Sequence, residues 1–186
     1  MFRELTTDRL RLRRLERADA ARLFAYRSLP GVTRFQAWEP RDEAEVARFI
    51  EGLEDIEPGE PGRWFQLGIT LTDGGQLVGD CGLHVPEGRD HEMEVGITLA
   101  PAFQGRGYAM EALGALLTYA FGPLGKHRVY GSVDPANLPS IRLMERAGMR
   151  REAHFRKNLW FKGAWADDVI YAMLDEEWGP RGPSEV

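Results

Sequence analysis

The chain has 186 residues, of which 43% are hydrophobic and 28% charged, a composition typical of one globular domain with a sizeable core. Its formal net charge of −5 argues against nucleic acid as the main partner, because phosphate binding needs clustered lysine and arginine. The single cysteine, Cys81, excludes an internal disulfide and a metal site built from several cysteines.

The first half of the chain predicts four strands and two helices. Short apolar runs, or apolar residues that alternate with polar ones, indicate strands at 9–15, 64–71, 76–85 and 91–99. Apolar residues at helical spacing indicate helices at 19–28 and from Asp42 to about Leu53. The turn TDGG between the second and third strands favours an antiparallel hairpin.

The second half of the chain completes the pattern. Two further helices are predicted at 105–121 and 137–147, with Gly148 ending the latter, and further strands at 127–133, 149–161 and 164–174. The strand-helix-strand unit over 91–133 makes one strand pair parallel. We therefore expect a single α/β (α+β) domain over 1–186 with an ordered core of about 6–178. Its sheet would be twisted, mixed and mostly antiparallel, with helices on both faces.

The stretch LAPAFQGRGYAMEAL (99–113) places two glycines where a strand pattern changes into a helix pattern. Free N–H groups at a helix N-terminus attract anions, and glycines allow a phosphate to approach the backbone. Gly105 and Gly107 therefore indicate an anion site to which Arg106 adds charge. A tight strand-to-helix turn without any ligand is the alternative explanation.

Two common phosphate motifs are absent from this turn. A dinucleotide fingerprint needs a third glycine where Met110 stands, and LGKH near residue 125 lacks the hydroxyl of a nucleotide-triphosphate loop. QGRGYA instead resembles the Gln/Arg-x-x-Gly-x-Gly/Ala turn of the GNAT N-acetyltransferase superfamily. NLPSIRLMERAGM (137–149) is similar to the Asn-x-x-Ser helix of its RimJ/RimL-like branch. The resemblance spans roughly Thr6 to Trp178.

The resemblance implies acetyl-CoA as co-substrate, with its pantetheine arm held between two splayed central strands. It also implies that a backbone N–H on the strand before the turn stabilises the oxyanion, and Gly96 is a candidate for a bulge that aims this group. Carried over residue by residue, the cofactor-binding positions are Ile97, Thr98, Leu99, Gln104, Gly105, Arg106, Gly107, Tyr108, Ala109, Asn137 and Ser140.

Acetyl transfer to an amine requires a base, because the ammonium must lose a proton before it attacks the thioester. Glu92 and Glu94 share one face of strand 91–99, and Glu94 lies closer to the proposed oxyanion donors. We predict that Glu94 is the base. A solvated strand glutamate is the alternative.

The departing thiolate needs a proton, for which many relatives use a tyrosine on the helix after the last core strand. This chain has no tyrosine between Tyr130 and Tyr171, so we predict that Ser140 takes this part and that Asn137 holds the pantetheine arm. Alternatively, Asn137 is only a helix N-cap and Ser140 part of the first turn.

The predicted function is acetyl-CoA-dependent N-acetylation of a primary amine, on a protein N-terminus or a small molecule, by direct attack on the thioester. Candidate acceptor-binding residues are Trp38, Glu92 and Trp160; half-buried packing is the alternative for the tryptophans. A non-catalytic acyl-CoA-binding sensor with the same fold is the alternative function.

The four histidines lack metal-ligand spacing, and nothing resembles a signal peptide or a membrane span. We expect a cytoplasmic monomer or homodimer without metal.

Overall fold

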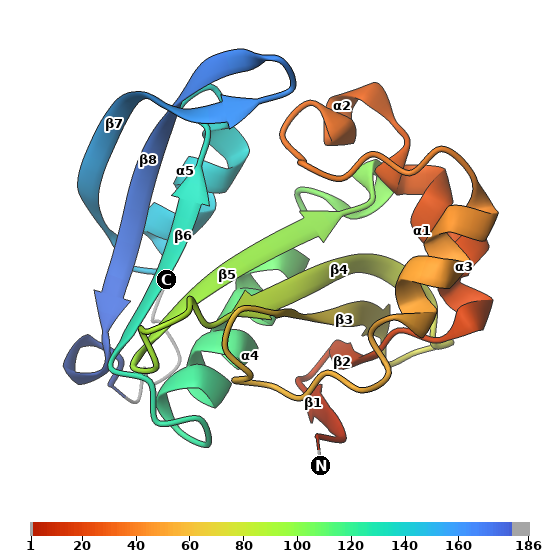
Figure 1. The fold of residues 1–186 in the computed structure, drawn as a ribbon. Helices are drawn as coiled ribbons and strands as arrows, with labels where there is room; N and C mark the ends of the chain where they lie inside the picture. Colours follow the sequence, from red (N-terminus) through yellow and green to blue (C-terminus); the bar gives the residue numbers. More distant parts are fainter. Residues whose placement is uncertain (1, 180–186) are drawn as a thin grey trace.

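The computed structural model describes residues 2–179, and its strands form one sheet in the order β1-β2-β3-β4-β5-β6-β8-β7 (Figure 1). The strands are β1 (Glu4–Thr6), β2 (Leu10–Arg14), β3 (Trp64–Leu71), β4 (Leu77–His84), β5 (Glu92–Leu99), β6 (Arg128–Val133), β7 (Arg150–Phe161) and β8 (Ala164–Leu174). Neighbouring strands are antiparallel except β5 and β6, which run parallel. The predicted mixed, mostly antiparallel sheet is therefore confirmed. The expected ordered core lies within the described range, whereas the chain end at 180–186 lies outside it.

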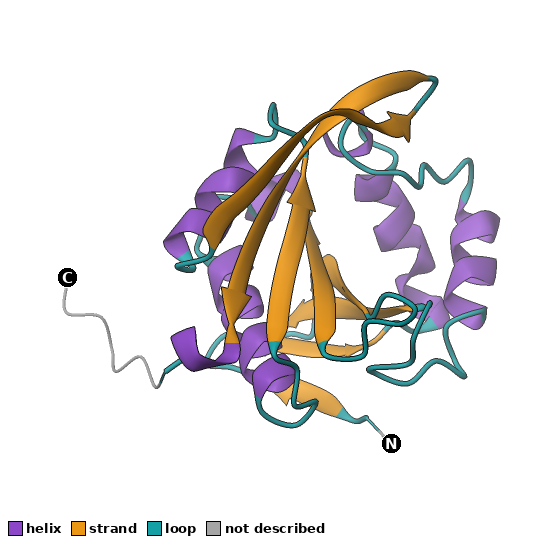
Figure 2. Cartoon of the chain, turned by 60° about the vertical axis from the view of Figure 1, so that its left-hand side comes forward, coloured by secondary structure: helices purple, strands orange, loops and turns teal. Residues whose placement is uncertain are grey.

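Helices cover both faces of this sheet, as predicted (Figure 2). The helices are α1 (Ala20–Arg27), α2 (Pro30–Thr33), α3 (Glu43–Glu51), α4 (Tyr108–Phe121) and α5 (Leu138–Arg146), with 3-10 turns at Arg17–Asp19, Pro101–Phe103 and Asp175–Glu177. The first three helices lie on one side of the sheet, and α4 and α5 lie on the other (Figures 1 and 2). Asp42 caps α3 by accepting a hydrogen bond from the Glu45 N–H, as its position before the apolar stripe predicts.

Three elements differ from the sequence prediction. The short strand β1 and the single turn α2 are too brief to show a hydrophobic period, so the pattern did not reveal them. Helix α4 begins at Tyr108 and not at residue 105, because Gly105 and Gly107 have φ angles of 73° and 83°. These left-handed angles do not occur inside an α-helix.

The central strands β5 and β6 separate after a short paired stretch. They pair only through Glu92–Arg128, Met93–Val129 and Glu94–Tyr130. Beyond that point β5 stays with β4 as far as Leu99, while β6 stays with β8 as far as Val133. The result is the V-shaped opening seen between the two strands in Figure 1, which confirms the expected splay.

The main hydrophobic core lies between the sheet and α4. Leu113, Leu116 and Leu117 of α4 are fully buried against apolar strand residues such as Met93. Full burial of one such side chain contributes roughly 1.5–3 kcal/mol to the free energy of unfolding, so this apolar face holds α4 firmly against the sheet.

Cys81 is also fully buried, and burial raises the pKa of its thiol well above the ordinary value. Among the described residues, no helix has the length and apolar character needed to cross a bilayer.

Candidate active site

The glycine turn before α4 presents unpaired backbone amides at the head of a 14-residue helix. Gly107 occupies the N-cap position, and within residues 2–179 no side chain caps this end. The first N–H groups of an α-helix have no acceptor inside the helix, and the helix dipole adds partial positive charge there. The turn therefore has the geometry of an anion site, as the two glycines predict.

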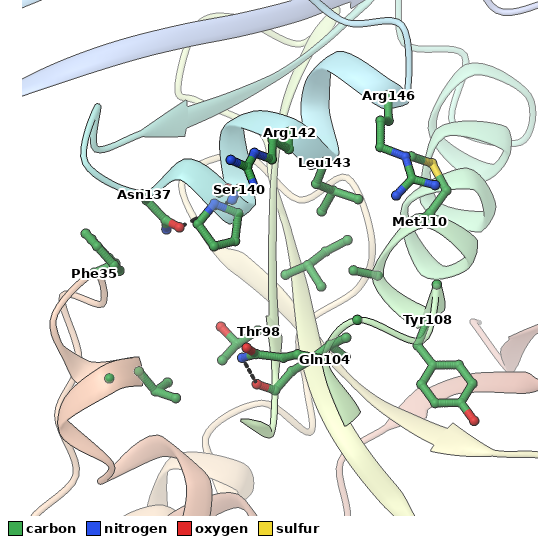
Figure 3. Close-up of a pocket in the computed structure, with 18 of the residues that line it drawn as sticks. Phe35, Thr98, Gln104, Tyr108, Met110, Asn137, Ser140, Arg142, Leu143 and Arg146 are labelled. Atoms are coloured by element: carbon green, nitrogen blue, oxygen red, sulfur yellow. Dashed lines mark hydrogen bonds between the residues drawn. The ribbon is translucent and has the colours of Figure 1, made fainter. Parts of the chain in front are cut away.

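A cavity of about 450 Å³ opens beside this turn (Figure 3). Its wall combines the segment around α2, the end of β5, the start of α4 and one side of α5. The lining residues are Gly31, Val32, Phe35, Gln36, Ile97, Thr98, Leu99, Gln104, Gly105, Gly107, Tyr108, Ala109, Met110, Asn137, Pro139, Ser140, Arg142, Leu143 and Arg146. Figure 3 shows Phe35 on the α2 side facing Asn137 and Ser140 of the α5 segment, with Gln104 and Tyr108 at the turn.

All the predicted cofactor-binding residues line this cavity except Arg106. The Arg106 carbonyl accepts a hydrogen bond of 3.1 Å from Arg9 Nη1. The Arg106 guanidinium lies over the Phe103 ring, 5.5 Å from the ring centre. Arg9 also pairs with Glu111 and lies over the Tyr108 ring. The N-terminal segment thus supports the turn from outside the cavity.

Sequence reasoning missed several lining residues. Arg142 and Arg146 bring two positive charges to the cavity from α5. Their spacing of four residues, together with Pro139 and Leu143 at helical spacing on one side of α5, is a signal that could have identified them. The residues around α2 carry no such signal, because only the folded chain brings that turn next to β5.

Beyond Glu94, the edge of β5 that faces β6 is not paired with another strand. The Ala100 N–H donates to the Val78 carbonyl on β4 at 2.9 Å, so alternation along the strand turns the N–H and C=O of Ile97 and Leu99 away from β4. The Leu99 carbonyl accepts a hydrogen bond from Gln104 Nε2 at 3.0 Å. The expected bulge at Gly96 was wrong, because Gly96 pairs in register with Gly82. This edge can accept an extended ligand as an added strand.

Four side chains lie in one register row across the sheet. Trp64 of β3 pairs with His84 of β4, His84 with Glu94 of β5, and Glu94 with Tyr130 of β6. The Tyr130 hydroxyl donates to Glu94 Oε2 at 3.4 Å, and His84 Nδ1 lies 3.8 Å from the same oxygen. Paired residues point to the same face of the sheet, so these four side chains are neighbours. Glu94 and Tyr130 form the last pair between β5 and β6, so Glu94 lies where the two strands begin to separate.

The environment of Glu94 shifts its proton affinity in the direction that a base needs. Burial raises the pKa of the Glu94 carboxyl, the hydrogen bond from Tyr130 opposes that rise, and the negative charge of Asp168 adds to it. Burial raises the pKa of Tyr130 to about 12, with the charges of Glu94 and Glu92 adding to the effect. Tyr130 therefore remains a proton donor to Glu94 at neutral pH.

Glu92 shares the face of Glu94, as predicted, but has cationic partners. Arg128 donates to Glu92 Oε2 through Nη1 at 2.8 Å and to Glu152 through Nη2, while Arg89 Nη1 lies 3.5 Å from Glu92 Oε1. The Glu92 carboxylate is thus held in ion pairs with two arginines, whereas no described arginine or lysine pairs with Glu94.

The Asn137 side chain caps α5. Its Oδ1 accepts a hydrogen bond of 3.3 Å from the Ser140 N–H, which is the capping geometry that the sequence left open. Both residues also line the cavity, so capping does not exclude contact with a ligand.

The two predicted acceptor tryptophans differ in their packing. Trp38 stacks on Phe49 with ring centres 4.4 Å apart and donates to Glu45, so it packs on α3. Trp160 is 60% exposed and meets Trp165 edge to face near the tip of the β7–β8 hairpin. No group of three or more His, Cys, Asp and Glu side chains in the described part of the chain is arranged to hold a metal.

Comparisons with known proteins match this architecture. A family model for the acetyltransferase (GNAT) domain matches residues 9–150. The uncharacterized N-acetyltransferase YnaD of Bacillus subtilis is 32% identical over 174 residues, covering 94% of this chain and 98% of that protein. The [ribosomal protein uS5]-alanine N-acetyltransferase of Escherichia coli is 30% identical over 181 residues, covering 95% and 93%. Mycobacterium smegmatis RimJ, solved in complex with CoA-disulfide, superposes with a TM-score of 0.79 at 25% identity, covering 90% and 83%. The chain is thus an N-acetyltransferase that belongs to the GNAT family and has RimJ-like relatives.

Proposed function

We propose that the chain transfers an acetyl group from acetyl-CoA to a primary amine, on a polypeptide N-terminus or a small molecule, with Glu94 as the base. The position of Glu94 carries this proposal. A partly buried carboxylate with raised pKa lies where β5 and β6 begin to separate, on a strand whose free edge leads to the uncapped amides of α4.

The cavity residues fit the parts of coenzyme A. The amides at the start of α4 suit the pyrophosphate, and Arg142 and Arg146 add positive charge for phosphate groups. The outward-facing N–H and C=O groups of Ile97 and Leu99 suit the amides of the pantetheine arm. Bound in this way, acetyl-CoA would supply a thioester carbonyl at the opening between β5 and β6.

Each remaining step is assigned to a group of this chain. Glu94 accepts the proton that the substrate ammonium must lose. An outward-facing backbone N–H of Ile97 or Leu99 stabilises the oxyanion. Ser140 donates a proton to the departing thiolate and regains one from the attacking nitrogen, which loses its extra proton as the amide forms. Glu92, held by Arg128, keeps a second carboxylate near the entering cation.

For the donor we propose one compound, acetyl-CoA, whereas for the acceptor we propose a class of primary amines. One relative is named for the alanine of ribosomal protein uS5, which supports a polypeptide N-terminus, while other acceptors fit the same chemistry because acceptor loops vary within one fold. The proposed setting is the cytoplasm, with the protein acting as a monomer or homodimer.

The test is a coenzyme A release assay with a panel of amines, followed by mass spectrometry of the acceptor. The panel contains short peptides with N-terminal alanine or serine, the same peptides with a blocked N-terminus, a polyamine and free amino acids. We expect thiol release and a 42 Da mass gain with at least one unblocked amine. Binding of acetyl-CoA without acetylation of any amine in the panel would contradict the proposed acceptors and favour the alternative, an acyl-CoA sensor without turnover.

A further inference from the structure

The imidazole of His84 has a buried nitrogen that the proposed mechanism does not use. His84 Nδ1 is buried without a hydrogen-bond partner among the described residues, and it lies 3.8 Å from Glu94 Oε2. A buried polar atom without a partner costs free energy, and a catalytic role is one reason for a protein to keep such an atom. The separation is slightly too long for a hydrogen bond, but a small movement of either side chain closes it once a proton lies between them.

Trp64 holds the imidazole in this orientation. The two rings stack with centres 5.1 Å apart and planes 16° apart. The indole lies across Gly82 and Gly96, which pair in register and have no side chains to obstruct it. A Cβ at Gly82 would lie 2.7 Å from Trp64 Cε3, so this stack depends on the glycine.

The other charged and titratable groups around Glu94 already have partners. Tyr130 is itself a donor to Glu94 Oε2, and its high pKa keeps its proton in place. Asp168 of β8 accepts a hydrogen bond from Ser132. Glu92 on β5 is paired with Arg128 of β6 and with Arg89. Among the described groups facing Glu94, His84 is therefore the one with an open acceptor.

We propose that His84 acts through Glu94 as a relay that carries the amine proton away from the site. This inference rests on the proposed function. Glu94 takes the proton from the ammonium, so an N–H bond breaks and an O–H bond forms. The proton then moves from Glu94 Oε2 to His84 Nδ1, and the imidazole releases its Nε2 proton to water. Glu94 returns to the carboxylate, and the neutral imidazole now carries its proton on Nδ1. Exchange with water removes this proton and replaces the one on Nε2, so both groups are ready for the next turnover with no change of oxidation state.

The environment of the pair favours this transfer. Burial lowers the pKa of His84 and raises the pKa of Glu94, which brings their proton affinities closer together than in water. Proton transfer between groups of matched affinity costs little free energy. The lowered pKa keeps His84 neutral at pH 7. In the tautomer with its proton on Nε2, the Nδ1 lone pair can accept a proton from Glu94.

Two variants test the relay. His84→Phe keeps a flat ring against Trp64 but has no nitrogen, and His84→Ala leaves space for an added imidazole. We expect both to lower kcat by roughly 10–100-fold, with the KM for acetyl-CoA unchanged. Imidazole in the buffer should restore kcat in His84→Ala. The restored kcat should rise with the concentration of neutral imidazole and then reach a plateau. It should not restore kcat in His84→Phe or in Glu94→Gln.

The outcomes separate this inference from the proposed function. An active wild-type enzyme with an unchanged kcat and pH profile in His84→Phe would overturn the relay and leave the acetyltransferase proposal intact. A loss in His84→Ala that imidazole does not restore would also overturn it, and melting temperatures of both variants identify any loss of fold. An inactive wild type would instead contradict the proposed function.

Discussion

Glu94 and Tyr130 form the last pair between β5 and β6, and the Tyr130 hydroxyl lies 3.4 Å from Glu94 Oε2. Past this pair the strands separate, so the carboxylate lies at the closed end of the opening. The free edge of β5 and the glycine turn lie farther along the same chain segment. One short parallel contact thus sets the position of the proposed base relative to the proposed coenzyme site.

The hydrogen bond between these residues predicts a pH effect. It lowers the pKa of Glu94, which burial otherwise raises, so Tyr130→Phe should raise that pKa further. Because the ionised carboxylate is the active form, activity appears only as the pH rises through this pKa. The acidic limb of the kcat/KM profile should therefore move to higher pH in the variant. An unchanged limb would show that Tyr130 does not tune Glu94.

Acetyl-CoA should raise the melting temperature, because a ligand that binds only the folded state stabilises it by about 2.7 kcal/mol at 100 times its Kd. Gly107→Val should abolish this shift, since valine avoids the φ of 83° that turns the amides toward the cavity. Gly125→Val is the matched control, with a φ of 57° in a turn that does not line the cavity. It should lose stability but keep the shift. Thermal unfolding with and without acetyl-CoA measures both, and equal shifts in the two variants would refute the anion site.

Substitutions of Ser140 and Asn137 distinguish a catalytic role from a role in capping α5. If its hydroxyl protonates the thiolate, Ser140→Ala should lower kcat by about 10–1,000-fold with little change in the free energy of unfolding. Asn137→Ala removes the acceptor for the Ser140 N–H and should cost about 1 kcal/mol without changing the pH dependence of turnover. Single-turnover kinetics and urea unfolding measure the two effects. A Ser140→Ala enzyme with normal turnover would remove this residue from the mechanism.

A buried ion pair anchors α1 to the sheet beside the cavity. Arg27 and Asp80 have side chains only 7% and 2% exposed, and the Tyr26 hydroxyl donates to Asp80 at 2.6 Å. Removing one partner leaves a buried charge uncompensated, so Asp80→Ala should cost roughly 3–5 kcal/mol in urea unfolding. Glu51→Gln, which breaks an exposed pair with Arg17, should cost less than about 1 kcal/mol. Similar losses in both variants would contradict the assigned importance of the buried pair.

The sequence predicted those parts of the site that depend on local pattern. Gly105 and Gly107 mark the turn, and period-two alternation places Glu94 on a defined face of its strand. The position of His84 depends on the register of β4 against β5, which no local pattern specifies. Trp38 was a candidate for the acceptor site, but its contact with Phe49 comes from the packing of α3, which only the folded chain shows. Single turns such as α2 escape detection because four residues cannot display a period.

The most direct test of the account is the turnover of Glu94→Gln, which keeps the size of the side chain and removes its basicity. We expect kcat at pH 7 to fall by roughly 10²–10⁴-fold, with an unchanged Kd for acetyl-CoA. The loss should shrink as the pH rises and more of the amine is already neutral. Glu92→Gln is the matched control and should lose less, because the Glu92 carboxylate is held in ion pairs with Arg128 and Arg89. Near wild-type turnover of Glu94→Gln at pH 7 would contradict the central claim and transfer the role of base to Glu92 or to water.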